Sequence, residues 1–159
     1  MKYRLHKEAS IAALLSVVCF ASLPPIAQAA GVQGAIDFRQ ATMQVYKWYM
    51  GPMGGMVKGK IPFDAAVFRN RAEALAKAAS LDLTEGFPGN SFSDSESDSD
   101  AKPEIRENWE DFMSKAKALK EASAKLASVA AGGDMAAMKK QFGTTGKTCK
   151  GCHDDYREK

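Results

Sequence analysis

The stretch IRENWEDFMSKAKALKEASAKLASV, residues 105–129, shows the clearest periodicity in the sequence. Pro103 precedes it and Gly132-Gly133 follow it, which are the positions that proline and glycine favour at helix ends. Its apolar residues recur at steps of three and four, the spacing of one helix face and not the step of two of a strand: Ile105, Trp109, Phe112, Ala116, Leu119, Ala122, Leu126 and Val129. The stretch therefore predicts an amphipathic helix.

The same period extends over most of the chain beyond residue 30. It recurs in three further segments: 32–50, 61–79 and 135–156. Gly51-Pro52 ends the first segment, Asp64 occupies the N-cap position of the second, and Asp134 lies at the start of the third. No alternating strand pattern competes with these helices. Four amphipathic helices with modest connections predict an all-α fold, an antiparallel four-helix bundle.

The first 29 of the 159 residues have the features of a secretion signal. Residues 1–10 carry positive charges, and residues 11–23 form an apolar run too short to span a bilayer. Ala27-Gln28-Ala29 then supplies the small residues that a signal peptidase accepts. We expect cleavage after Ala29, with cleavage one residue later and an uncleaved anchor as the alternatives. Residues 30–159 would then form one periplasmic domain with no membrane anchor.

The composition, 45% hydrophobic and 26% charged, is that of a globular protein. The whole chain has a formal net charge of +3. Removing residues 1–29 takes away three basic residues and one acidic residue, which leaves a net charge of +1. Such a balanced surface argues against a nucleic-acid partner, because binding to phosphates requires a basic surface.

The connection 82–102 contains the serine-rich acidic run SFSDSESDSD at residues 91–100. A calcium loop starting at Asp94 would need glycine in place of Ser99 and a carboxylate in place of Ile105, so that reading is poor. A docking surface for a basic partner is a second alternative. We expect a flexible, solvated loop, because its like charges repel one another.

Chemistry is concentrated in the motif Cys149-Lys150-Gly151-Cys152-His153. Because His6 and Cys19 belong to the predicted signal, this motif contains every histidine and cysteine of the remaining chain. Residues three and four apart lie on one face of a helix, so both sulfurs can bond to the vinyl groups of a haem while the imidazole reaches its iron. The spacing therefore predicts one covalently attached haem c. A zinc site is excluded, because two cysteines and one histidine cannot supply the four ligands that zinc requires.

Two alternatives to haem attachment share this spacing. A dithiol oxidoreductase uses the same pair of cysteines, but in a βαβ setting and at a helix N-terminus. A structural disulfide within one helix would close a very small loop and stabilise little. The motif lies in the last helix of an all-helical chain, which favours haem attachment over both.

The first predicted helix places three candidate residues toward the same site. Arg39 lies on the core face, where an unpaired charge is costly, so a haem propionate is its expected partner and Gln40 can add a hydrogen bond. An arginine extending to the end of the bundle is the alternative. Met43 lies one turn further on and can ligate the iron, cover it, or simply fill the core.

Taken together, these residues resemble the cytochrome c′ family. The resemblance rests on five stretches: Phe38-Arg39-Gln40, Val57-Lys58-Gly59, Ile61-Pro62-Phe63-Asp64-Ala65-Ala66, Pro103-Glu104-Ile105 and CKGCHDDYR at 149–157. It implies a haem bound through Cys149 and Cys152, with His153 as the proximal ligand and Arg157 near the imidazole. It also implies that Arg39 and Gln40 contact a propionate and that Met43 covers the distal face.

The resemblance further implies function. Similar proteins are periplasmic homodimers that bind nitric oxide or carbon monoxide at a five-coordinate iron, and a second apolar set on the first helix suits such a dimer: Phe38, Val45, Trp48 and Tyr49. A low-spin electron carrier with both His153 and Met43 on the iron is the alternative, with its redox partner unidentified. We expect no enzyme, since no second histidine remains to act as acid or base.

Overall fold

The computed structural model describes residues 25–95 and 98–159, with side chains from Gly31 onward. Residues 1–24 of the predicted signal lie outside the described residues, as do His6 and Cys19; its last five residues belong to the first helix. No helix in the described part of the chain combines the length and apolarity needed to cross a membrane.

The described part of the chain folds into five α-helices and one 3₁₀ turn. In order they are α1 Pro25–Val57, α2 Ala65–Ala78, η1 Leu83–Gly86, α3 Glu104–Glu107, α4 Trp109–Ala131 and α5 Met135–Tyr156. The only β pairing among the described residues is an isolated bridge between Ala101 and Arg157. The predicted all-α four-helix bundle is confirmed, with α1, α2, α4 and α5 as its helices.

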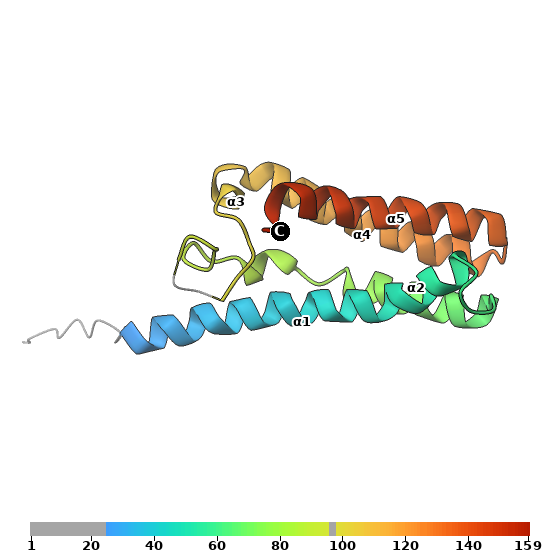
Figure 1. The fold of residues 1–159 in the computed structure, drawn as a ribbon, viewed down its shortest axis with the longest axis horizontal. Helices are drawn as coiled ribbons and strands as arrows, with labels where there is room; N and C mark the ends of the chain where they lie inside the picture. Colours follow the sequence, from blue (N-terminus) through green and yellow to red (C-terminus); the bar gives the residue numbers. More distant parts are fainter. Residues whose placement is uncertain (1–24, 96–97) are drawn as a thin grey trace, which may run out of the picture.

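Figure 1 shows how the helices are arranged. α1 runs along one side, α4 and α5 run along the other, and α2 lies beside the second half of α1, where it packs against α1 and α4. At the opposite end, where α5 terminates, η1 and the segment after it occupy the space between the two sides.

Two of the helix starts follow the predicted caps. The Asp64 carboxylate accepts a hydrogen bond from the backbone N–H of Val67 at 3.0 Å. The Asp134 carboxylate accepts from Ala136 at 2.8 Å and from Ala137 at 3.1 Å. Each aspartate satisfies N–H groups that have no partner within the helix, which fixes where α2 and α5 begin.

The predicted end of the first helix at Gly51-Pro52 is wrong, because α1 continues to Val57 with Pro52 inside it. Proline has no N–H to offer to the carbonyl four residues earlier, which here belongs to Trp48. Arg71 of α2 supplies the missing donor, with its Nη1 atom 3.1 Å from the Trp48 oxygen. A contact from a neighbouring helix therefore replaces the bond that proline removes.

The single helix predicted over 105–129 is interrupted at Asn108, which separates α3 from α4. Asn108 lies at φ −115° and ψ 37°, outside the helical region. Its side-chain amide donates to the carbonyl oxygen of Glu104 at 3.0 Å. An asparagine that bonds to nearby backbone in this way competes with the helix, and this explains the break.

The buried apolar side chains form two separate groups. The large cluster joins α1, α2, α4 and α5 around Tyr46, Met53, Met56, Phe68, Ala72, Leu75, Ala79, Leu126, Ala130 and Met138. The small cluster lies near the end of α5 and consists of Phe92, Ile105, Phe112 and Tyr156. The core of the bundle is thus discontinuous along its length.

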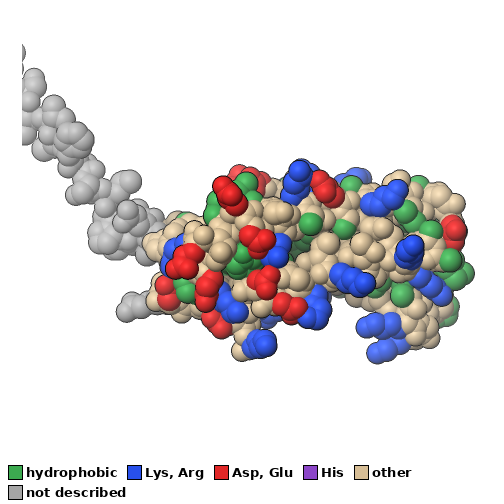
Figure 2. Space-filling view, turned by 90° about the horizontal axis from the view of Figure 1, so that it is seen from above, with side chains coloured by type: hydrophobic (Ala, Val, Ile, Leu, Met, Phe, Trp, Pro, Cys, Tyr) green, Lys and Arg blue, Asp and Glu red, His purple; other side chains and the backbone are tan. Residues whose placement is uncertain are grey.

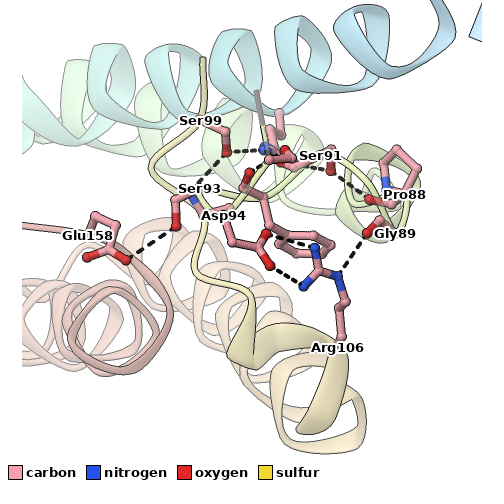
Figure 3. Close-up of polar contacts among 12 residues, drawn as sticks. Pro88, Gly89, Ser91, Ser93, Asp94, Ser99, Arg106 and Glu158 are labelled. Carbon is pink, nitrogen blue, oxygen red and sulfur yellow. Dashed lines mark hydrogen bonds and ion pairs between the residues drawn. The ribbon is translucent and has the colours of Figure 1, made fainter. Parts of the chain in front are cut away.

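The acidic connection is not the solvated loop that the sequence predicts. Ser91 and Phe92 are buried, and Arg106 of α3 fastens the segment beside them (Figure 3). The Arg106 guanidinium donates two hydrogen bonds to Asp94, both at 2.9 Å, and a third to the carbonyl of Gly89 at 2.8 Å. Its cation also lies 4.5 Å from the centre of the Phe92 ring. The described part of this loop is therefore folded against α3.

Candidate functional site

A cavity of about 630 Å³ separates the two clusters. Its volume falls within the range of roughly 300–1,000 Å³ typical of cofactor sites. All seven site residues predicted from the sequence line it: Arg39, Gln40, Met43, Cys149, Cys152, His153 and Arg157. The fold therefore brings residues from α1 and from the end of α5, more than a hundred positions apart, to one cavity.

The α5 wall of the cavity carries the two cysteines and the histidine. All three are half-buried, and both thiols are free, so no disulfide joins them. Burial raises the pKa of the Cys152 thiol to about 11 and also raises the pKa of Cys149. A redox-active dithiol requires a lowered pKa, so the environment argues against the dithiol oxidoreductase alternative.

His153 has an electrostatic environment that favours the neutral imidazole. Burial lowers its pKa, and the positive charge of Arg157 lowers it further. Neutral imidazole is the form that binds a metal through a ring nitrogen. Arg157 itself is exposed and donates a hydrogen bond to the Asp100 carboxylate at 3.3 Å, which keeps it beside the cavity.

The α1 wall carries Arg39, which is only 5% exposed. It donates to the carbonyl oxygen of Gly86 at 2.7 Å and to the hydroxyl of Ser91 at 2.8 Å. It also donates to the Ser91 carbonyl and the Ser99 hydroxyl, and its guanidinium lies 4.7 Å from the centre of the Phe87 ring. A propionate is the partner predicted for Arg39; in the structure neutral oxygens of the chain accept its hydrogen bonds, and no described carboxylate pairs with it.

Gln40 and Met43 complete the predicted part of this wall. The exposed Gln40 side chain donates to the carbonyl oxygen of Asp98 at 3.1 Å. Met43 is half-buried, packs against the large cluster and faces the cavity. Its position suits both roles that the sequence left open, iron ligand and steric cover.

Several lining residues were not predicted as site residues. Tyr46 follows Met43 by one turn of α1 and lines the cavity with it. The apolar period of this helix includes Tyr46, but the period alone predicts a core residue and not a site residue. Phe87, Ser99, Asp100 and Ala101 come from the irregular connection, where no periodicity marks an inward-facing position.

The connection joins the two walls of the cavity. On the α1 side, Ser91 and Ser99 accept hydrogen bonds from Arg39. On the α5 side, the backbone N–H of Glu158 donates to the Asp100 carbonyl at 2.8 Å, and the Ser93 hydroxyl donates to the Glu158 carboxylate at 3.3 Å (Figure 3). The loop thus holds the end of α5 and the middle of α1 at a fixed spacing.

Charge is divided along the molecule. Exposed acidic residues are frequent in the loop, α3 and the start of α4: Asp94, Asp98, Asp100, Glu104, Glu107, Glu110 and Asp111. Exposed lysines are frequent near the opposite end: Lys58, Lys60, Lys125, Lys139 and Lys140. Figure 2 shows one face, on which most acidic side chains lie on the left half while basic side chains occur on both halves. The charged side chains that line the cavity itself are mainly basic: Arg39, Lys47, Lys115 and Arg157, with Asp100 as the acidic one.

A sequence profile of the family described as Cytochrome C′ matches residues 34–157, which include every residue that lines the cavity. The chain belongs to the cytochrome c′ family. A cytochrome c′ from Halomonas halodenitrificans is 40% identical over 128 residues, which cover 79% of this chain and 96% of that protein.

Solved cytochromes c′ share the fold. The structure of cytochrome c prime from Shewanella frigidimarina is 40% identical with a TM-score of 0.75, covering 80% of this chain and 97% of that one. A nitric oxide complex of a cytochrome c prime variant from Alcaligenes xylosoxidans is 31% identical with a TM-score of 0.71, again covering 80% and 97%. These relatives are cytochromes by name.

Members of this family carry one covalently attached haem c with its iron, and so does this chain. The cavity suits that group in three respects. It has the volume of a cofactor site, it presents two free thiols beside a neutral imidazole, and it has a buried cation without a carboxylate partner at its edge. A propionate is the kind of anion that such a cation favours.

Proposed function

We propose that this chain binds its haem c in the cavity between the two clusters and that the bound iron takes nitric oxide or carbon monoxide. The observation that supports this most is the convergence of seven separately predicted residues on one cavity of cofactor size. A relative, cytochrome c prime from Alcaligenes xylosoxidans, has been solved as a nitric oxide complex of a variant, and gas binding by this chain would follow the same pattern.

In this proposal the α5 wall holds the cofactor. Cys149 and Cys152 bind it through thioether bonds, and His153 binds the iron as the neutral imidazole. When bound there, the haem would supply an iron centre able to take a small ligand. Burial lowers the pKa of His153, and the positive charge of Arg157 lowers it further, so both favour the neutral imidazole.

The α1 wall determines what reaches the iron. Met43 covers the face opposite His153, and Tyr46 narrows the space beside it. The positive charge of Arg39 attracts a propionate to this edge, while its Nη1 and Nη2 donors stay on Gly86, Ser91 and Ser99. Since apolar side chains such as Leu83, Phe112 and Leu119 also line the cavity, an anion would lose hydration there, whereas a neutral diatomic gas meets no such barrier.

We further propose that the chain is exported to the periplasm, forms a homodimer and is not an enzyme. Export rests on the signal-like residues 1–29. The dimer is supported by the exposed Val45 and Trp48 on α1, 41% and 69% exposed, and a solved relative shows ligand-controlled dimer dissociation.

The test is an absorption spectrum of the reduced, haem-loaded protein with and without carbon monoxide. We expect a high-spin spectrum that carbon monoxide converts completely. Met43→Ala should leave the spectral type unchanged and speed ligand binding, because only a cover has been removed. Sharp low-spin bands that carbon monoxide leaves unaltered would overturn the gas-binding proposal.

A second function, one-electron transfer, is favoured by the thioether of Met43 in the cavity lining. If Met43 ligates the iron together with His153, the closed coordination sphere raises the potential and excludes gases. Met43→Ala would then convert a low-spin spectrum into a high-spin one that binds carbon monoxide. The same pair of samples therefore separates the two functions.

A further inference from the structure

A second cavity, of about 290 Å³, adjoins the first. It lies among the end of α2, η1 and the first half of α4. Four residues line both cavities: Tyr46, Leu83, Ala116 and Leu119. One layer of side chains therefore separates the two spaces.

The second cavity has an apolar outer edge. Leu81 and Met113 line it and are 56% and 47% exposed, which is unusual for large apolar side chains in this molecule. The charged groups that also line it, among them Lys117 and Lys120, are exposed and can extend into solvent. The cavity therefore offers apolar surface from its outer edge to the shared layer.

The position of this cavity relative to the two walls is informative. None of the described residues that line it belongs to α5, so it does not reach the wall of Cys149, Cys152 and His153. α1 contributes Tyr46, one turn beyond Met43. The second cavity therefore meets the main cavity on the side that Met43 faces, opposite His153.

We propose that the second cavity is the route by which neutral diatomic gases pass between solvent and the face of the main cavity opposite His153. Apolar cavities can hold small apolar molecules such as xenon. They exclude ions, because an ion would lose its hydration there without gaining a partner. Movement of the Leu83 and Leu119 side chains in the shared layer opens the way between the two spaces. This inference rests on the proposed gas-binding function and specifies its access route.

The test narrows the outer edge without touching the main cavity. Met113→Trp adds bulk at a residue that lines only the second cavity. Met135→Trp is the matched control, because Met135 is equally exposed at 47% and lines neither cavity. Both variants are compared with the wild-type holoprotein by flash photolysis and rapid mixing with carbon monoxide.

A blocked route has a distinctive kinetic signature. Association and release should both slow, by roughly tenfold and by the same factor, so that the affinity stays the same. The Met135→Trp protein should match the wild type. Unchanged rates in Met113→Trp, or a change in affinity with only one rate altered, would overturn the proposal.

Xenon provides a readout that does not depend on the iron. In crystals of the holoprotein under xenon pressure, the gas should occupy the second cavity in the wild type and in Met135→Trp but not in Met113→Trp. If carbon monoxide does not bind at all, the proposed function fails, and xenon still decides the access route. Absence of xenon from the wild-type cavity would overturn it.

Discussion

The two ends of the bundle are held together in different ways. At one end, α1, α2, α4 and α5 all contribute to the large cluster. At the other end, the small cluster contains no described residue of α1, which is joined to the rest there by hydrogen bonds from Arg39 to Gly86, Ser91 and Ser99. Between the two lies the cavity.

This difference shows where the haem acts as part of the core. Apolar burial stabilises in proportion to area, whereas a hydrogen bond contributes only about 1 kcal/mol net. The end with the large cluster can therefore fold on its own side chains. The end with the cavity requires the cofactor to fill the space that apolar side chains fill elsewhere.

Preventing haem attachment with Cys149→Ser and Cys152→Ser together should have the largest effect on the difference in stability between the two ends. We expect a loss of more than about 5 kcal/mol, beyond what single core truncations usually cost. Hydrogen exchange should rise most in α1 around residues 36–46 and in the loop, and least around Phe68. Equal thermal midpoints with and without haem would contradict this.

The end with the large cluster can be weakened by Phe68→Ala. Phe68 is fully buried and stacks on Phe63 at 5.4 Å and against the edge of Phe142 at 6.2 Å. Losing this ring should cost about 4 kcal/mol, measured by urea unfolding of the holoprotein. The affinity for carbon monoxide should stay the same. Val67→Ala, at a 38% exposed neighbour, should cost far less and serves as the control.

Arg39→Gln tests the polar connection at the other end. The change leaves several buried oxygens without a donor, and we expect a loss of about 2 kcal/mol. Hydrogen exchange should rise in the loop but not in the large cluster. Arg39→Lys keeps the charge and loses the forked geometry, so it should recover only part of the stability. A uniform increase in exchange along the whole bundle would argue that the two ends are not separable.

The smallest expected effect concerns Tyr156, whose hydroxyl donates to the Asp111 carboxylate at 2.6 Å. This bond holds the pKa of Asp111 below its ordinary value in the folded protein. Its contribution to the free energy of unfolding is therefore fully present above about pH 3.9, the pKa of an unfolded aspartate. The contribution is lost as the pH falls through the lower pKa of the folded state. Tyr156→Phe should lower the thermal midpoint at pH 7, and the difference from wild type should shrink on acidification below that value. A difference independent of pH would mean that only packing was lost.

Most of the fold could be predicted because helical periodicity and caps are local. Asp64 and Asp134 begin their helices as expected. The two errors arose where other contacts decide the outcome. Local rules end a helix at Pro52, but Arg71, nineteen positions away, supplies a donor. The break at Asn108 depends on a side-chain bond that the apolar period does not reveal.

The site was predictable in proportion to its regularity. Cys149, Cys152 and His153 form a contiguous motif, and Arg39 and Met43 lie on one helical stripe. The loop was not predictable, because its acidic composition indicates solvation while its buried Ser91 and Phe92 depend on Arg39 and Arg106 in separate helices. An irregular segment has no repeating apolar pattern from which its buried residues could be predicted.

The proline within α1 links two helices into one cooperative unit. Because Arg71 of α2 donates to the carbonyl of Trp48, α2 stabilises α1 at the turn that contains the proline. A synthetic peptide spanning residues 31–57 should therefore lose its helix near Trp48, whereas a helical hairpin extended through Ala78 should retain it. During folding, these two segments are expected to order together.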